Sequence, residues 1–186
     1  MTTDGDLTEG EHGAGGWPDT AGDTALTIKV PQADPLVRAG FPAHVTVLYP
    51  FLHESRIDAP LRRELSALFA GHDAFTLTFA EFGRYPGVLY LEPWPRDPVQ
   101  ALTKDLTQRW PEAVPYRGIF GTGLDPHLTI ATSEAPAAQE AGQEAAYDEL
   151  ERELAPALPL VCPVREVELI VWDGVRWQGR ARYRLG

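Results

Sequence analysis

The sequence predicts an α+β domain assembled from two similar halves, and two observations carry this prediction. The tetrad histidine, apolar, threonine, apolar occurs twice, at 44–47 and at 127–130. After each tetrad the apolar periodicity predicts a helix and then two further strands, once within 43–92 and again within 127–183. Such a duplication favours two lobes related by an approximate twofold axis, which would place the two tetrads opposite each other.

In the first half, alternating residues predict strands, and leucines at helical spacing predict one helix. Asp58 suits the N-terminal cap of this helix, and Pro60 fits its first turn. The predicted elements are a strand at 24–30, a strand at 43–49, a helix at 58–70 and strands at 75–79 and 87–91.

In the second half, a helix begins with Asp97 as its cap and Pro98 at its first position, and Pro111 ends it. The tetrad histidines are 83 positions apart, and this offset aligns 75–82 with 158–165. The further predicted elements are a loop at 111–125, a strand at 127–132, a helix at 135–154 and strands near 158–163, 165–172 and 175–183.

Composition indicates one domain in a chain of 186 residues. We expect residues 1–22, which are polar and rich in glycine, to form a disordered leader before a single two-lobed domain at 23–186. One cysteine excludes a disulfide framework, and Cys162 lies in an apolar run where we expect it to be buried. Because the sequence shows neither a secretory signal nor a membrane-spanning run, we expect a cytoplasmic protein without membrane partners.

The net charge of −11 is unevenly distributed. Acidic residues concentrate in 1–23 and in 134–153, where we expect a solvated helix face, and the remaining residues carry nearly equal numbers of acidic and basic side chains. No basic stripe is present, which excludes tight, sequence-independent binding to long nucleic acid. A small nucleotide or an RNA end is the partner that fits, and we expect a monomer.

The tetrads place chemistry on one face of each strand. Alternate side chains of a strand share a face, so His44 lies beside Thr46, and His127 lies beside Thr129. Two such strands brought together would surround a small anion with two acid–base groups and two hydroxyl donors. This arrangement suits reactions of a phosphodiester.

Other polar and aromatic residues are weaker candidates. The pairs Arg84-Tyr85 and Tyr116-Arg117 stand beside predicted turns, where they could stack on a base and pair with a phosphate, or pack as ordinary surface residues. Alternation places Tyr49 on the strand face opposite His44, in the core. His53 and His72 are predicted at surface or capping positions. No cluster has metal-ligand spacing, so we expect neither a metal nor a cofactor.

The two tetrads and their flanks resemble the two-histidine phosphoesterase superfamily. The strings Pro-Ala-His-Val-Thr-Val-Leu-Tyr-Pro-Phe at 42–51 and Pro-His-Leu-Thr-Ile-Ala at 126–131 are most similar to its bacterial 2′-5′ RNA ligase-like, or RNA cyclic phosphodiesterase, branch. Segments 88–93 and 110–118 also resemble this branch. The resemblance implies a bilobal fold in which two antiparallel sheets face a central cleft, with helices outside.

The resemblance further implies a metal-independent enzyme acting on 2′,3′-cyclic phosphates or 2′-5′-linked ends of RNA and small nucleotides. His44 and His127 would be the catalytic pair, and Thr46 and Thr129 would hold the phosphate oxygens. The same groups acting in reverse would form a 2′-5′ bond, and the sequence leaves open which histidine is the base. Two alternatives remain: a noncatalytic module that binds RNA ends or nucleotides, and a structural protein whose histidines only pack.

Overall fold

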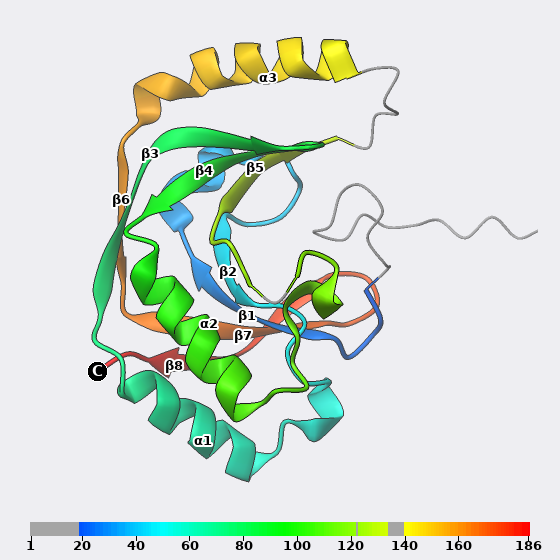
Figure 1. Ribbon diagram of the computed structural model, residues 1–186, viewed down its shortest axis with the longest axis vertical. Helices are drawn as coiled ribbons and strands as arrows, with labels where there is room; N and C mark the ends of the chain where they lie inside the picture. Colours follow the sequence, from blue (N-terminus) through cyan, green and yellow to red (C-terminus); the bar gives the residue numbers. More distant parts are fainter. Residues whose placement is uncertain (1–18, 122, 134–139) are drawn as a thin grey trace, which may run out of the picture.

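The computed structural model describes residues 19–121, 123–133 and 140–186. The described residues form the strands β1 to β8 and the α-helices α1 to α3 (Figure 1). In order they are β1 (Thr24–Lys29), β2 (His44–Leu48), α1 (Ala59–Ala70), β3 (Phe75–Tyr85), β4 (Val88–Trp94), α2 (Asp97–Arg109), β5 (Leu128–Thr132), α3 (Glu140–Leu154), β6 (Leu160–Val164), β7 (Glu166–Trp172) and β8 (Trp177–Arg184). Residues 134–139, where the predicted third helix begins, lie outside the described residues.

The strands form two antiparallel four-stranded sheets, which confirms the predicted α+β class with two sheets. Sheet A has the order β2-β1-β7-β8, and sheet B has the order β5-β4-β3-β6. Each tetrad strand is therefore the edge strand of its own sheet. The hairpin that follows the first tetrad, β3-β4, belongs to the sheet of the second tetrad, and β7-β8 belongs to the sheet of the first.

When the two strand orders are compared place by place, β2 is equivalent to β5, β1 to β4, β7 to β3 and β8 to β6. The 83-residue offset therefore relates the tetrad strands β2 and β5 but not the strands that follow them, because it aligns β3 with β6. These two strands are hydrogen-bonded neighbours in sheet B, with Phe75 opposite Val164 and Phe79 opposite Leu160. The offset records the order of apolar runs along the chain, and that order does not specify which strands pair.

The helix ends follow the capping residues closely. Asp58 Oδ1 accepts a hydrogen bond from the backbone N–H of Leu61 (2.9 Å), which confirms the predicted cap of α1. The prediction for α2 was wrong by one residue: Arg96 is the cap, and Asp97 is the first helical residue. Its carboxylate lies in the first turn, where a negative charge is favourable near the helix N-terminus.

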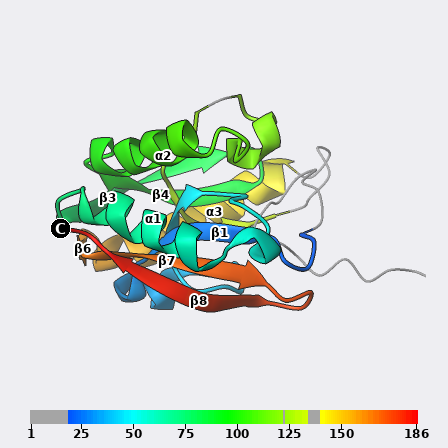
Figure 2. The same ribbon diagram turned by 90° about the horizontal axis from the view of Figure 1, so that it is seen from below.

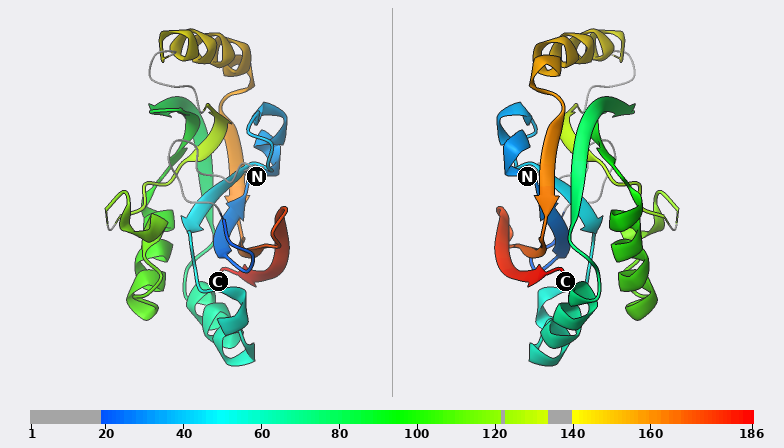
Figure 3. Two further views of the ribbon diagram at one scale, coloured as in Figure 1. Left: turned by 90° about the vertical axis from the view of Figure 1, so that its right-hand side faces the viewer. Right: turned by 90° about the vertical axis from the view of Figure 1, so that its left-hand side faces the viewer.

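The main core lies where the apolar faces of the sheets meet the helices. On the sheet A side, Phe69 of α1 stacks on Tyr183 of β8, and Thr103 of α2 donates to the carbonyl oxygen of Val47 (2.6 Å). On the sheet B side, the hydroxyl of Tyr147 in α3 donates to the carbonyl oxygen of Gly87 (3.0 Å). Figure 2 shows α2 and β8 on opposite sides of the molecule, and Figure 3 shows α1 and α3 at opposite ends.

Two further predictions concern the chain start and Cys162. Residues 19–22 make defined contacts, because Gly22 donates its N–H to the carbonyl oxygen of Trp172 (2.8 Å) and accepts from the N–H of Glu54 (2.8 Å). The folded part thus includes these four residues, which the sequence assigns to the leader, whereas residues 1–18 lie outside the described part. Cys162 is buried, as predicted. None of the described helices is long and apolar enough to cross a membrane.

Candidate active site

One face of sheet A carries the histidine and the threonine of the first tetrad. In the register of β1 and β2, Thr27 lies opposite Thr46, and Lys29 lies opposite His44. Both threonines are buried, whereas the His44 ring is half-buried. Val45 and Val47 point to the other face and enter the main core, as strand alternation predicts.

The two histidines make the same hydrogen bond to their own backbone. The Nδ1 atom of His44 lies 2.8 Å from the carbonyl oxygen of Pro42, and that of His127 lies 2.8 Å from the carbonyl oxygen of Asp125. Because a carbonyl oxygen only accepts, each Nδ1 must carry the proton and donate it. In both rings Nε2 is therefore the nitrogen that can take up or release a proton during a reaction.

The tetrad strands meet at the junction of the two sheets. Edge strands β2 and β5 are in contact, although the tetrads are separated by about half of the chain (Figure 1). The fold thus brings the strand of His44 and Thr46 into contact with the strand of His127 and Thr129. The contact between these two strands exists only in the tertiary structure.

Aromatic rings surround His127. The ring centroids of Tyr85 and Tyr90 each lie 5.5 Å from that of His127, and the two tyrosines stack on each other at 4.5 Å. The Tyr85 hydroxyl donates to Asp125 Oδ2 (2.7 Å), and Arg96 donates to Asp125 Oδ1 (2.8 Å). Burial, followed by the hydrogen bond to Asp125, raises the pKa of Tyr85. The hydroxyl therefore stays protonated and holds the residue whose backbone orients His127.

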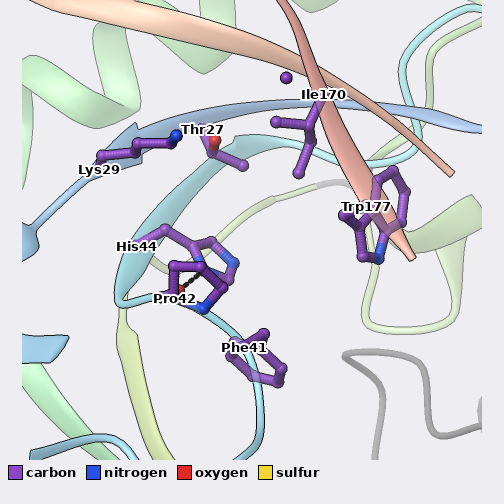
Figure 4. A pocket seen from close by; sticks show the side chains of 8 residues that line it. Thr27, Lys29, Phe41, Pro42, His44, Ile170 and Trp177 are labelled. Carbon is purple, nitrogen blue, oxygen red and sulfur yellow. Dashed lines mark hydrogen bonds between the residues drawn. The ribbon is translucent and has the colours of Figure 1, made fainter.

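His44 instead borders a pocket on sheet A. Figure 4 shows His44 and Trp177 on opposite sides of this pocket, with Phe41 at one end. The Phe41 ring centroid lies 5.3 Å from that of His44. Lys29 forms a 2.7 Å ion pair with the buried carboxylate of Glu168 on the same sheet face. The remaining lining residues are Thr27, Pro42, Ile170 and Gly179.

The position of Tyr49 corrects one prediction. It is fully buried, but it packs with Ala25, Ile170 and Trp177 on the sheet face that carries His44. The reason is a register shift in the β1–β2 pairing between Leu26 and Thr27. The extra residue reverses the alternation beyond it, and simple period-two counting does not detect this.

Strand alternation also separates Arg84 from Tyr85. Arg84 faces α3, where it pairs with Glu144, with Asp148 (2.7 Å) and with Glu151 (2.8 Å). These hydrogen bonds, led by that to Asp148, raise the pKa of Arg84. Glu144 and Asp148 are exposed, as expected of a solvated helix face, and together with Glu151 they also hold a cation of β3. Of the pair Arg84-Tyr85, the structure places Tyr85 beside a tetrad histidine.

Tyr116 and Arg117 lie in a loop with left-handed backbone, at φ values of 47° and 53°. Tyr116 is buried, with its ring 6.1 Å from that of Tyr49, and it donates its N–H to the carbonyl oxygen of Tyr49 (2.7 Å). Arg117 pairs with Asp23 at 3.0 Å. These contacts anchor the loop to the end of β2 and the start of β1.

His53 and His72 occupy the surface or capping positions that the sequence predicts. His53 Nδ1 accepts from the N–H of Ser55 at the start of a short 3-10 turn, and His72 Nε2 lies 3.0 Å from Asp105. Within the described residues, no group of three or more His, Cys, Asp or Glu side chains could hold a metal ion.

Sequence reasoning missed Lys29, Glu168, Tyr90 and the two aromatic walls of the pocket. One signal was present for Glu168: its carboxylate lies between the apolar residues Val167 and Leu169, inside a strand that is mostly apolar. A buried carboxylate requires a partner, and here that partner is Lys29. Phe41 and Trp177 carry no comparable signal, because aromatic residues in loops and at strand ends are common in cores.

Comparisons with known proteins agree with this architecture. The sequence model of the 2′-5′ RNA ligase superfamily matches residues 19–176. E. coli LigT in complex with 3′-AMP superposes with a TM-score of 0.54 at 16% identity, covering 89% of this chain and 99% of LigT. The protein TT0787 of Thermus thermophilus superposes with a TM-score of 0.55 at 16% identity, covering 88% and 97% of the two chains. No curated protein matches the sequence.

Proposed function

The chain belongs to the 2′-5′ RNA ligase superfamily, and on this premise we propose that it is a metal-independent phosphodiesterase. Its substrates are 2′,3′-cyclic phosphates or 2′-5′-linked ends of RNA and small nucleotides. His44 and His127 act as general base and general acid, and Thr46 and Thr129 bind the phosphate oxygens. E. coli LigT has been crystallised with 3′-AMP and with ATP, and these small nucleotides are of the class proposed here.

The observation that carries the proposal is the matched hydrogen bond of the two histidines. Each ring donates Nδ1–H to a carbonyl oxygen two residues before it, which leaves Nε2 for proton transfer. A neutral imidazole can accept a proton at this nitrogen, and a protonated one can release it there near neutral pH. Two histidines with this same hydrogen bond can serve a reaction in which one group accepts a proton and the other releases one.

The two histidines and one water molecule account for every bond and proton transfer of the hydrolysis. The oxygen of water forms a bond to phosphorus while its proton passes to Nε2 of one histidine. The bond between phosphorus and one ribose oxygen breaks, and that oxygen receives the proton from Nε2 of the other histidine. Hydroxyls of Thr46 and Thr129 donate to the phosphate oxygens on which negative charge increases. If a 5′-hydroxyl takes the place of water, its oxygen bonds to phosphorus, the bond from phosphorus to the 3′ oxygen breaks and that oxygen takes the proton, and a 2′-5′ bond results.

Tyr85 is the one further aromatic candidate retained in the proposal. Its ring contacts the edge of His127, and its hydroxyl binds the Asp125 carboxylate. Through Asp125 it acts on the orientation of His127, so we assign it a positioning role. Arg84, Tyr116 and Arg117 have contacts that stabilise α3 and the 115–118 loop, and the proposal does not use them.

The test measures turnover of 2′,3′-cyclic AMP by His44→Ala and His127→Ala in the presence of EDTA. Each substitution is expected to lower kcat by about 10²–10⁴-fold. His72→Ala is the matched control, since it removes a histidine that pairs with Asp105 on a helix surface. Wild-type turnover by both tetrad variants, or activity that EDTA abolishes, would contradict the proposed mechanism.

A further inference from the structure

We propose that the sheet A pocket beside His44 binds the nucleobase of the substrate, with the base against Trp177 and Phe41. This inference rests on the proposed function and specifies on which side of the phosphate the base lies. The pocket shares His44 with the first tetrad, so a ligand bound there would reach the histidine directly (Figure 4).

A comparison of the two sheets explains why the base would bind at sheet A and not at sheet B. Thr27 lies opposite the tetrad threonine Thr46, and Tyr90 occupies the matching place opposite Thr129. Tyr90 and Tyr85 stack on each other and fill the space beside His127. On sheet A the smaller Thr27 leaves a pocket. The pseudo-twofold symmetry is thus broken at the place where a planar ligand could enter.

The walls of the pocket suit a planar aromatic ligand. Trp177 and Phe41 are both half-buried, so part of each ring is accessible. Every nucleobase has a π face that can stack on such rings, and a stacked base gains affinity without sequence preference. Ile170 adds an apolar side chain to the pocket lining.

The Trp177 ring is already held in place. It packs against Tyr49 at 5.8 Å and against Trp172 at 5.7 Å between ring centroids. Asp173 closes the β7–β8 hairpin by accepting from the N–H groups of Val175 and Arg176 (2.8 and 2.9 Å). A wall that is ordered before binding reduces the entropy that the ligand must offset.

Polar side chains in the pocket lining can form hydrogen bonds with a ligand. Lys29 and Thr27 line it, and Lys29 is held by Glu168 at 2.7 Å. An added Cβ at Gly179 would lie 2.7 Å from Glu168 Oε1, so the glycine permits the carboxylate to occupy this position. The ammonium of Lys29 can donate to a carbonyl oxygen or ring nitrogen at the edge of a base.

The test compares two substrates that differ only in the base: 2′,3′-cyclic AMP and the 2,3-cyclic phosphate of methyl β-ribofuranoside. Trp177→Ala and Phe41→Ala are expected to raise the KM for 2′,3′-cyclic AMP by at least about fivefold, as loss of a stacked base predicts. The KM for the base-free substrate should stay within about twofold of wild type. Trp177→Phe should restore most of the affinity, which separates loss of stacking from loss of structure.

Trp94→Ala is the matched control, because Trp94 is 73% exposed and lies on β4 of the other sheet. An equal rise in KM for both substrates in Trp177→Ala and Phe41→Ala would overturn the base pocket and leave the proposed function standing. Wild-type protein that hydrolyses neither substrate would instead refute the proposed function. In that case, the base pocket is tested by calorimetric titration of wild type and Trp177→Ala with 3′-AMP and with ribose 5-phosphate. The base pocket requires that the substitution weakens the binding of 3′-AMP but not that of ribose 5-phosphate.

Discussion

The ring of Tyr90 fills the space into which a side chain at Gly83 would project. The two residues are opposite each other in the register of β3 and β4, and an added Cβ would collide with the tyrosine ring. Tyr90 in turn stacks on Tyr85 and contacts His127. A glycine two strands away from the tetrad thus permits the aromatic packing that surrounds one of its histidines.

Gly83→Ala is expected to displace Tyr90 and to disturb the orientation of His127. We expect kcat for 2′,3′-cyclic AMP to fall by about tenfold and the free energy of unfolding to fall by about 1–3 kcal/mol, the usual cost of overpacking. Activity assays and denaturant unfolding check the two effects. Gly142→Ala is the control, since an added Cβ at this helical glycine meets no atom within 4 Å. Unchanged kinetics in Gly83→Ala would show that Tyr90 does not act on His127.

Tyr85→Phe removes one hydroxyl and leaves the stacked ring. The lost hydrogen bond to Asp125 is worth about 0.5–1.5 kcal/mol, so we expect a fall in kcat of about three- to tenfold. If the role is positioning, KM should change little, and the pH dependence of kcat should shift because the contacts that orient His127 change. A rise in KM alone would assign Tyr85 to substrate binding instead.

Loss of Lys29 would leave the carboxylate of Glu168 buried without its nearest cation. Glu168 is 6% exposed, and the next cation, Arg182, lies farther away at 3.6 Å. We expect Lys29→Met to lower the free energy of unfolding by about 1–3 kcal/mol, the cost of an unsatisfied buried polar group. The double variant Lys29→Met with Glu168→Gln should recover part of that loss in chemical denaturation. Additive losses would show that the two side chains are not coupled.

Asp173 makes the stability of the β7–β8 hairpin depend on pH in the acidic range. Hydrogen bonds from the N–H of Arg176, from Gln178 and from the N–H of Val175 lower the pKa of Asp173 to about 2. Because the folded pKa lies below the ordinary value of 3.8, the stabilisation is complete above that value and is lost as the pH falls towards 2. Asp173→Ala should therefore have a lower Tm than wild type at pH 7, and the difference should narrow below about pH 4. A difference that is constant down to about pH 2.5 would contradict this.

The residue pattern alone determined the element types and the tetrads with their histidine and threonine pairs. Alternation and helical spacing are local properties, so the cap of α1 at Asp58 and the burial of Val45 and Val47 follow from neighbouring residues. The family resemblance supplied the antiparallel sheets, which the structure confirms.

Only the tertiary structure decided what depends on pairing between distant strands. The exchange of hairpins between the halves and the register shift that turns Tyr49 towards the His44 face both follow from how distant strands pair. The pocket of Phe41 and Trp177 joins side chains more than 130 positions apart. Strand register depends on the free energy of the whole sheet, and this free energy cannot be inferred from a short segment of the sequence.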